Sequence, residues 1–217
     1  MRTYGDPCGI ARALDLVGER WALLVIRELL LGPKRFTDLR VGLPHVGPDM
    51  LAQRLRELEQ AGVVQRAKLP PPAGARVYEL TDRGRELEPV VLALGRWGSQ
   101  APFPPDHGEL GVDALVLALK TLFEPGRRDE LSGRTFELRL GEDVFTLRVG
   151  ERELKAVRGA ARDATATIAT DPGILQQILW HGRSPRAGGL EVAGDRRAAE
   201  RFLRLFPLRS RTVAATQ

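Results

Sequence analysis

The sequence predicts an α+β protein of two domains: an N-terminal helical domain that ends in a β-hairpin, and a C-terminal domain that combines a sheet with helices. Apolar residues recur at helical spacing through most of residues 9–60, and they alternate with polar residues between 135 and 149. The chain of 217 residues also exceeds the usual size of one domain. We expect domains at 1–100 and 110–206, a linker at 101–109 and a flexible tail at 207–217.

Composition narrows the class of protein. A hydrophobic content of 43% is ample for ordered cores, and a net charge of +5 with a pI near 10.0 favours polyanionic partners. The single cysteine, Cys8, excludes an internal disulfide framework and fits a reducing compartment. The N-terminus lacks the apolar core of a signal peptide, and no apolar run is long enough to span a bilayer. We therefore expect a cytoplasmic protein with no membrane partner.

Three helices are expected before residue 44. Segments at about 9–17 and 20–31 have apolar residues at helical spacing, and Gly32-Pro33 ends the second. We expect these two helices to pack together. The stretch "RFTDLRVGL" then predicts a short third helix that is capped by Thr37 or a neighbour.

The stretch "VGPDMLAQRLRELEQAGVVQR" predicts a fourth helix with Pro48 in its first turn. At about 100° per residue, one narrow stripe of this helix is apolar and the opposite face is polar. The apolar stripe consists of Leu51, Leu55 and Leu58. The polar face consists of Asp49, Gln53 and Arg56, flanked by Met50 and Glu57. The stripe anchors the helix and leaves a face whose amide and guanidinium groups suit base edges or phosphates. The alternative, which this helix alone does not exclude, is a solvated amphipathic helix.

A hairpin follows the fourth helix. The runs "VVQRAKL" and "ARVYEL" are β-prone, and "PPPAG" joins them in a projecting, proline-stiffened tip. The stretch "TDRGRELEPVVLALGRWGSQ" then predicts a helix that is capped by Thr81 or Asp82 and continues to about Trp97. Four helices, two strands and a further helix are the element order of a helix-turn-helix followed by a β-wing.

Several short motifs in residues 6–100 resemble the HxlR-type winged-helix transcriptional regulators of bacteria. They are a cysteine near the start, "GERW" at the second helix, "RF.DL" in the third, "ML.QRLRELE" in the fourth and "Y.LT..G" after the hairpin. The resemblance implies a homodimeric DNA-binding regulator, a repressor in our interpretation. Its fourth helix would enter the major groove of double-stranded DNA, with the wing on the backbone or minor groove.

Transferred to this sequence, the resemblance identifies ten candidate DNA-binding residues. Those of the third and fourth helices are Thr37, Pro48, Asp49, Met50, Gln53, Arg54 and Arg56, and those of the wing are Arg66, Lys68 and Arg76. Arg54 and Arg56 have an alternative role in ordinary helical ion pairs with Glu57 or Glu59. The acidic Asp49 departs from the family pattern. Asp49 can accept a hydrogen bond from a cytosine amino group, yet it repels phosphates.

The cysteine and the three histidines give little support to a redox or metal site. Cys8 is interpreted as a small buried apolar residue, with a redox-sensing thiol, known in some HxlR-type proteins, as the alternative. His45 lies in a predicted turn, and His107 and His181 have no companion at metal-ligand spacing, so no metal site is expected.

In the second half, "LGVDALVLALKTLF" predicts a helix capped by Asp113, and the following segment predicts an antiparallel sheet with one wet face. Apolar residues alternate there with polar ones. The inward set is Phe136, Leu138, Leu140, Phe145, Leu147 and Val149, and the outward set is Glu137, Arg139, Thr146 and Arg148.

The stretch "DATATIATD" predicts another strand of this sheet, and "DPGILQQILWHGR" predicts a helix with Pro172 near its first turn. The stretch "LEVAGDRRAAERFLRLF" predicts a strand and then a helix that starts near Asp195. Residues 110–206 resemble the sterol-carrier-protein-like fold, which implies a sheet covered by helices around an apolar tunnel.

The resemblance implies an effector domain that binds a lipid or another apolar small molecule. Candidate cavity residues are Phe136, Leu138, Phe145, Leu147, Ile168, Trp180 and Phe202, with Phe206 as a further candidate. The alternative is that these side chains fill a core or a dimer interface. The sequence has no GxSxG, HExxH, phosphate-loop or dinucleotide motif, so we expect neither an enzyme nor a bound cofactor. An apolar-ligand carrier, or an interaction module whose winged helix does not bind DNA, is the competing function.

Overall fold

The computed structural model describes residues 3–70, 74–101, 108, 110–124 and 131–207. The chain divides into two compact units, Met1–Val91 and Leu92–Gln217. Apart from residues 101, 108 and 207, the expected linker and tail lie outside the described residues, as does His107. Within the described ranges, no helix is long and apolar enough to cross a membrane.

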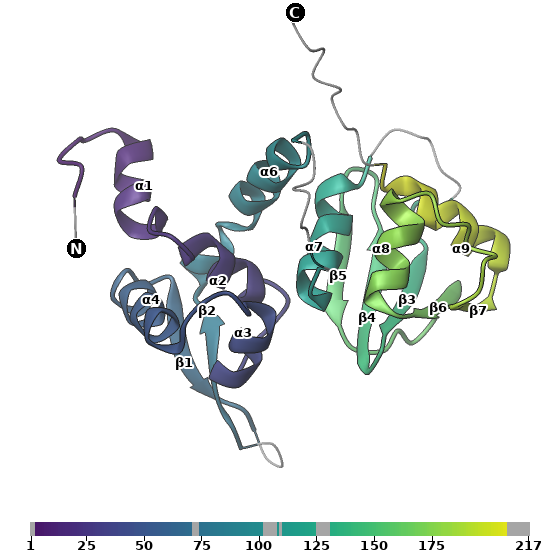
Figure 1. Cartoon of the computed structure of the whole chain (residues 1–217), viewed down its shortest axis with the longest axis horizontal. Coiled ribbons are helices and arrows are strands. Elements are labelled where there is room, and N and C mark those ends of the chain that lie inside the picture. The colour runs from purple at the N-terminus through teal and green to yellow at the C-terminus, as the bar shows by residue number, and fades with distance from the viewer. Residues whose placement is uncertain (1–2, 71–73, 102–107, 109, 125–130, 208–217) are drawn as a thin grey trace, which may run out of the picture. The chain divides into compact units, whose positions relative to one another are not determined.

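The first unit has the predicted order of elements, which Figure 1 shows from purple to teal. Its elements are α1 (Gly9–Val17), α2 (Ala22–Leu29), α3 (Phe36–Gly42), α4 (Pro48–Gln60), β1 (Val64–Lys68), β2 (Arg76–Leu80), α5 (Asp82–Arg85) and the start of α6 (Glu88–Gly98). The strands β1 and β2 pair in antiparallel register. A helix-turn-helix with a two-stranded wing results.

One apolar core holds the first unit together. Val25 and Ile26 of α2 and the leucine stripe of α4 are almost fully buried, and Val63 and Leu80 close the core from the wing side. Pro48 occupies the first turn of α4 as predicted, and Gly62 adopts a left-handed φ of 68° just after the helix ends. The core therefore fixes one side of α4 and the direction in which the wing leaves it.

Two local expectations for the first unit are corrected. Helix α1 buries only Val17 and leaves Ile10 exposed, so it does not pack along α2 over its full length. Thr37 lies inside α3 and does not cap it. Its neighbour Asp38 does so, because the Asp38 carboxylate accepts a hydrogen bond from the Arg35 backbone N–H at 3.0 Å.

The single helix predicted after the wing is divided into α5 and α6. Thr81 caps α5 as one of the two predicted alternatives, because its hydroxyl oxygen accepts a hydrogen bond from the Gly84 N–H at 3.0 Å. Pro89 lies in the first turn of α6. Backbone N–H groups there have no acceptor within the helix, so the missing N–H of proline costs no hydrogen bond. The division between the two units falls within α6.

The second unit is a five-stranded sheet with helices on one face (Figure 1). Its elements are α7 (Val112–Leu122), β3 (Thr135–Leu140), β4 (Asp143–Val149), β5 (Leu154–Arg158), β6 (Ala166–Thr170), α8 (Pro172–Trp180), β7 (Leu190–Gly194), α9 (Arg196–Phe202) and the 3₁₀ turn η1 (Leu203–Leu205). The strand order is β5-β4-β3-β6-β7. The predicted inward set of β3 and β4 is buried, as expected.

The prediction of an antiparallel sheet is wrong for one pair, because β6 lies parallel to β3. Residues 159–165 connect β5 to β6, and the Ala161 N–H within this segment donates to the Glu137 carboxylate at 2.9 Å. The connection thus crosses the face that was expected to be wet and buries Glu137 there. Alternation in the sequence indicates which face a side chain occupies, but it carries no information about the direction of the neighbouring strand.

Two of the three predicted helix starts in the second unit are confirmed. The carboxylates of Asp171 and Asp195 accept backbone N–H bonds at the starts of α8 and α9. Asp113, in contrast, is not a cap. Gly111 precedes α7, and Asp113 is buried as the second residue of the helix, where it accepts a hydrogen bond from Arg158 at 2.6 Å.

Candidate DNA-binding surface

The outer face of α4 is exposed as the sequence predicts. Asp49, Gln53 and Arg56 lie in solvent, whereas the leucine stripe on the other side is at most 1% exposed. Pro48 is also exposed, and Met50 is 40% exposed. The buried stripe fixes the axial rotation of the helix and therefore the direction in which the polar face points.

Arg54 does not belong to this exposed face, which corrects its assignment as a DNA-binding residue. It is only 4% exposed. Its guanidinium pairs with Glu57 and lies 3.7 Å from Glu19, the residue that precedes Arg20 in the turn between α1 and α2. A helical wheel places Arg54 only about 40° from Leu58, and this position indicates that Arg54 lies beside the buried stripe.

The ion-pair alternative therefore holds for Arg54 but not for Arg56. Within the described part of the chain, Arg56 makes no hydrogen bond or ion pair, so its five donors face solvent. Gln53 donates from its amide nitrogen to Glu57 at 3.0 Å. The face thus offers one solvated guanidinium and one amide that is held by a neighbouring carboxylate.

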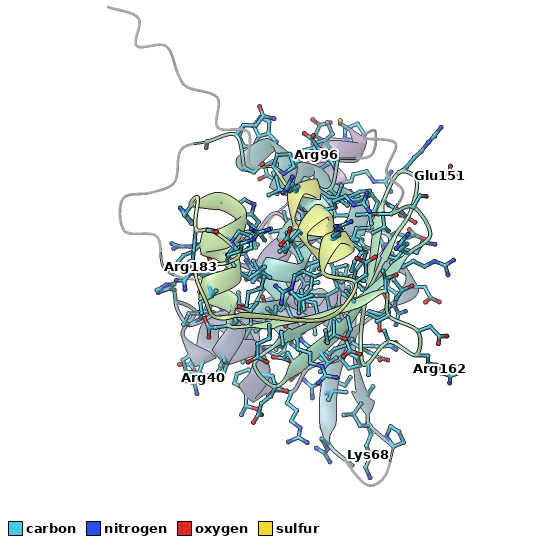
Figure 2. The ribbon with its side chains drawn as sticks, turned by 90° about the vertical axis from the view of Figure 1, so that its right-hand side faces the viewer. Arg40, Lys68, Arg96, Glu151, Arg162 and Arg183 are labelled. Atoms are coloured by element: carbon cyan, nitrogen blue, oxygen red, sulfur yellow. The ribbon has the colours of Figure 1, made fainter. Side chains whose placement is uncertain are left out.

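The wing places one lysine and one arginine opposite each other near its tip. Lys68 on β1 is the register partner of Arg76 on β2, and both are exposed. Figure 2 shows Lys68 at the projecting end of the hairpin. Residues 71–73 of the predicted tip lie outside the described residues. Two cations at this end suit contact with a phosphate backbone.

Arg66 is held against the base of the wing. Its guanidinium donates to Glu59 of α4 at 2.7 and 3.1 Å and lies 5.6 Å from the ring centroid of Tyr78. The hydrogen bond to Glu59 raises the pKa of Arg66 above its usual value. Arg66 therefore links α4 to the wing and is less available to DNA than Lys68 or Arg76.

A buried carboxylate that the sequence did not reveal positions α3 and the wing. Glu28 is 2% exposed and binds Arg27 at 2.8 Å and Lys34 at 2.6 Å. The backbone of Lys34 in turn exchanges hydrogen bonds with that of Tyr78 at 2.8 and 2.9 Å. Glu28 thus stabilises the connection that leads into α3, which carries exposed Thr37 and Arg40. Arg40, labelled in Figure 2, was absent from the predicted site.

The thiol of Cys8 is exposed, so its interpretation as a buried apolar residue is wrong. Its backbone N–H donates to the Asp6 carboxylate at 2.8 Å, just before α1 begins. A redox role for Cys8 stays a prediction. His45 is exposed, and the described residues contain no cluster of His, Cys, Asp or Glu that could hold a metal ion.

The candidate cavity residues of the second unit lie together and pack against one another. Phe136 stacks on Phe202 with ring centroids 4.3 Å apart, and Phe206 meets Phe202 edge-on at 5.1 Å. The indole N–H of Trp180 donates to the Phe206 carbonyl at 3.2 Å. The remaining candidates are at most 1% exposed, and they are Leu138, Phe145, Leu147 and Ile168. In this arrangement these groups form a core.

Known proteins match the first half of the chain. Residues 16–104 match the HxlR-like helix-turn-helix family. The transcriptional regulator YodB of Bacillus subtilis is 39% identical over 94 residues, which are 43% of this chain and 84% of YodB. The uncharacterized regulator YvaP of the same species is 35% identical over 89 residues, which are 41% of this chain and 82% of YvaP. A solved structure of the redox regulator HypR in its oxidized form is 34% identical, covers 45% of this chain and 100% of its own, and has a TM-score of 0.41.

A helix with a buried stripe and an exposed polar face, followed by a basic wing, defines a helix-turn-helix DNA-binding protein. The chain belongs to the HxlR-like helix-turn-helix family. It is therefore a DNA-binding transcriptional regulator. The competing function, an apolar-ligand carrier with a winged helix that does not bind DNA, is not supported.

Proposed function

We propose that the protein is a repressor that binds operator DNA as a homodimer, with α4 in the major groove and the wing on the flanking backbone. The observation that carries this proposal is the polar face of α4, which the buried leucine stripe directs into solvent. Bidentate donors such as Arg and Gln are the side chains that read base edges. A repressor of this kind acts on the chromosome, so we assign it to the cytoplasm.

Individual residues have distinct roles in this proposal. Gln53 and Arg56 read bases, and Asp49 accepts a hydrogen bond from a cytosine amino group. Lys68 and Arg76 contact phosphates and supply affinity without sequence preference. The residues at the edges of the contact surface are Thr37, Pro48, Met50 and Arg66.

Exposed apolar side chains support the homodimer. Ile10 of α1 is 73% exposed, and Val90 is 52% exposed at the start of α6. Burying such residues against a second copy removes apolar surface from water. A two-fold dimer presents two copies of α4 to half-sites that lie roughly 34–36 Å apart, or a multiple of that distance.

We further propose that residues 110–206 form a sterol-carrier-protein-like effector domain. The five-stranded sheet, with apolar side chains facing the helices on one side, supports this proposal. An apolar effector would enter only if the Phe136–Phe202 stack separated. Such a ligand would alter DNA affinity by favouring one arrangement of the two reading helices.

A gel-shift titration with the DNA upstream of the protein's own gene tests the DNA-binding proposal. We expect retardation of that DNA at concentrations that leave a scrambled duplex free, with affinity that falls as salt rises. A footprint should show two protected half-sites, and light scattering should give twice the chain mass. Equal binding of both duplexes at every salt concentration would contradict operator recognition, and a chain that stays monomeric while it protects one half-site would contradict the dimer.

A further inference from the structure

A pocket of about 720 Å³ lies between the N-terminal residues Thr3 and Tyr4, helix α1 and the inner edge of α4. Its volume is within the range of sites for small organic molecules. Apolar atoms of Tyr4, Leu14 and Met50 form part of its wall. The pocket shares Met50 and Gln53 with the DNA-contact surface proposed above, whereas its other lining residues have no role in that function. All of its lining residues belong to the first unit.

The charged lining of the pocket is predominantly acidic. Three carboxylates, those of Asp15, Glu19 and Glu57, face one guanidinium, that of Arg54, so their formal net charge is −2. Arg54 has little to offer an anion, because Glu57 and Glu19 already flank its guanidinium. The pocket therefore favours a ligand with positive charge.

The three carboxylates differ in how fully their oxygens are occupied. Asp15 accepts bonds from the Thr3 hydroxyl at 3.0 Å and from the Tyr4 N–H at 2.9 Å, which hold the N-terminal residues in place. Glu19 has a side chain that is 55% exposed, and its contact with Arg54 is long at 3.7 Å. Glu19 is thus the carboxylate best able to accept a new donor.

We propose that this pocket binds a small amphipathic cation, an amine or amidine carried on an apolar body. The ammonium group donates to Glu19 and Glu57, and the apolar body lies against Tyr4, Leu14 and Met50. Charge-assisted hydrogen bonds of this kind are about twice as strong as neutral ones. The combination of an acidic end and an apolar wall selects against neutral and anionic molecules of the same shape.

A chain of polar contacts connects the pocket to the DNA-reading face. Gln53 donates to Glu57, Glu57 accepts from Arg54, and Arg54 approaches Glu19. An ammonium group that donates to Glu57 competes with the Gln53 amide and releases it toward solvent. If Gln53 reads bases, which rests on the function proposed above, the bound cation raises DNA affinity.

Calorimetric titration of the full-length protein tests the binding step. The probes are 4-phenylbutylamine, the neutral 4-phenyl-1-butanol and the anionic 5-phenylpentanoate, which carry their polar groups on the same phenylbutyl chain. We expect the amine to bind about tenfold more tightly than either of the others. Equal binding of the three probes, or tighter binding of the carboxylate, would overturn the proposal.

Two charge-removing variants locate the site. Glu19→Gln should weaken amine binding by about tenfold. Glu86→Gln is the matched control, because Glu86 is exposed and lines a separate pocket beside α1. It should leave amine binding unchanged. Both positions are on the surface, and thermal melting checks that the variants fold. An equal loss in the two variants would show general charge attraction and would contradict the assigned site.

A gel-shift titration with and without saturating amine tests the coupling. The wild-type protein should bind operator DNA about threefold more tightly with the amine. Gln53→Ala should still bind the amine in calorimetry but should lose this response. Amine binding without any change in DNA affinity, or with a decrease, would refute the coupling. A wild-type protein that binds the amine but no operator DNA would refute the proposed function and leave the ligand site standing.

Discussion

Two aspartates at equivalent positions of two helices have opposite environments. Asp49 is the second residue of α4 and Asp113 the second residue of α7, and each helix is preceded by glycine. Asp49 is exposed, whereas Asp113 is 5% exposed and binds Arg158. A carboxylate is favourable in the first turn of any helix. What packs around the helix therefore decides whether such a group faces a partner or the protein interior.

The helices themselves differ in the same way. Helix α4 buries a stripe of leucines together with Arg54 and leaves its other face in solvent. Helix α7 is buried over most of its circumference, with its buried residues including Leu115, Val116 and Leu117 in succession. Substitutions on the outer face of α4 should affect recognition, whereas substitutions in and around α7 should affect stability.

The largest effect is expected from the apolar interior of the second unit. Phe136→Ala should lower the free energy of unfolding of that unit by about 3–5 kcal/mol, because it removes a fully buried ring from its stack on Phe202. Urea denaturation followed by circular dichroism measures the loss, and Phe136→Leu should cost less. A loss below about 1 kcal/mol would favour a ligand cavity over a core at this position.

The next effect separates base reading from phosphate contact in the first unit. Gln53→Ala and Arg56→Ala should each cost about 1–3 kcal/mol on the preferred operator and relax base preference at particular positions. Lys68→Ala and Arg76→Ala should weaken binding to all sequences and reduce the salt slope by about one. A binding-site selection assay with each variant distinguishes the classes. Identical selection profiles from both pairs would show that the assigned faces are wrong.

Periodicity in the sequence predicted the features that depend on a single element. The leucine stripe of α4, the inward residues of β3 and β4, and the starts of α8 and α9 are all confirmed. Each follows from spacing along one helix or strand, or from a cap that lies within a few residues of the helix it begins.

Features that depend on contacts between distant segments were not predictable in this way. The parallel pairing of β6 with β3 and the burial of Glu28 depend on which elements become neighbours. The same reason explains Asp113, whose partner Arg158 lies 45 residues away. Arg54 is different, because its angular position beside Leu58 could be read from the sequence. Its assignment to the DNA-binding face followed from its being an arginine and not from its position on the helix.

The paired aspartates give a third prediction of smaller size. Although burial opposes its charge, the pKa of Arg158 is raised by Asp113 and by Asp143. Asp113→Asn should destabilise the second unit by about 1–2 kcal/mol, since Asp143 is then the one anionic partner that Arg158 keeps among the described residues. Asp49→Asn should change stability by less than about 0.5 kcal/mol and alter only DNA binding. Equal changes in the midpoint of urea unfolding for the two variants would contradict the contrast between α4 and α7.

The smallest effect concerns the pH dependence of stability and the face of the sheet opposite its helices. The pKa of Glu137 lies below its usual value, first because Arg139 donates to its carboxylate at 2.7 Å and then because the Ala161 N–H does so at 2.9 Å. Since the folded-state pKa is the lower one, Glu137 contributes its full stabilisation above the ordinary value of 4.5, and this contribution is lost as the pH falls through the folded-state pKa. The measurement is a series of urea midpoints from about pH 7 to about pH 3.

Glu137→Gln should lower the midpoint near neutral pH and flatten its decline below pH 4.5, because glutamine keeps an acceptor for Ala161 but cannot take up a proton as the pH falls. Glu151→Gln is the matched control, because Glu151 is exposed at the edge of the same unit (Figure 2), and it should leave the profile of the wild-type protein unchanged. If Glu137→Gln retained the full acid-induced decline, the pH dependence would belong to other carboxylates with a lowered pKa, such as Asp195. The segment 159–165 would then cover the sheet without depending on the charge beneath it.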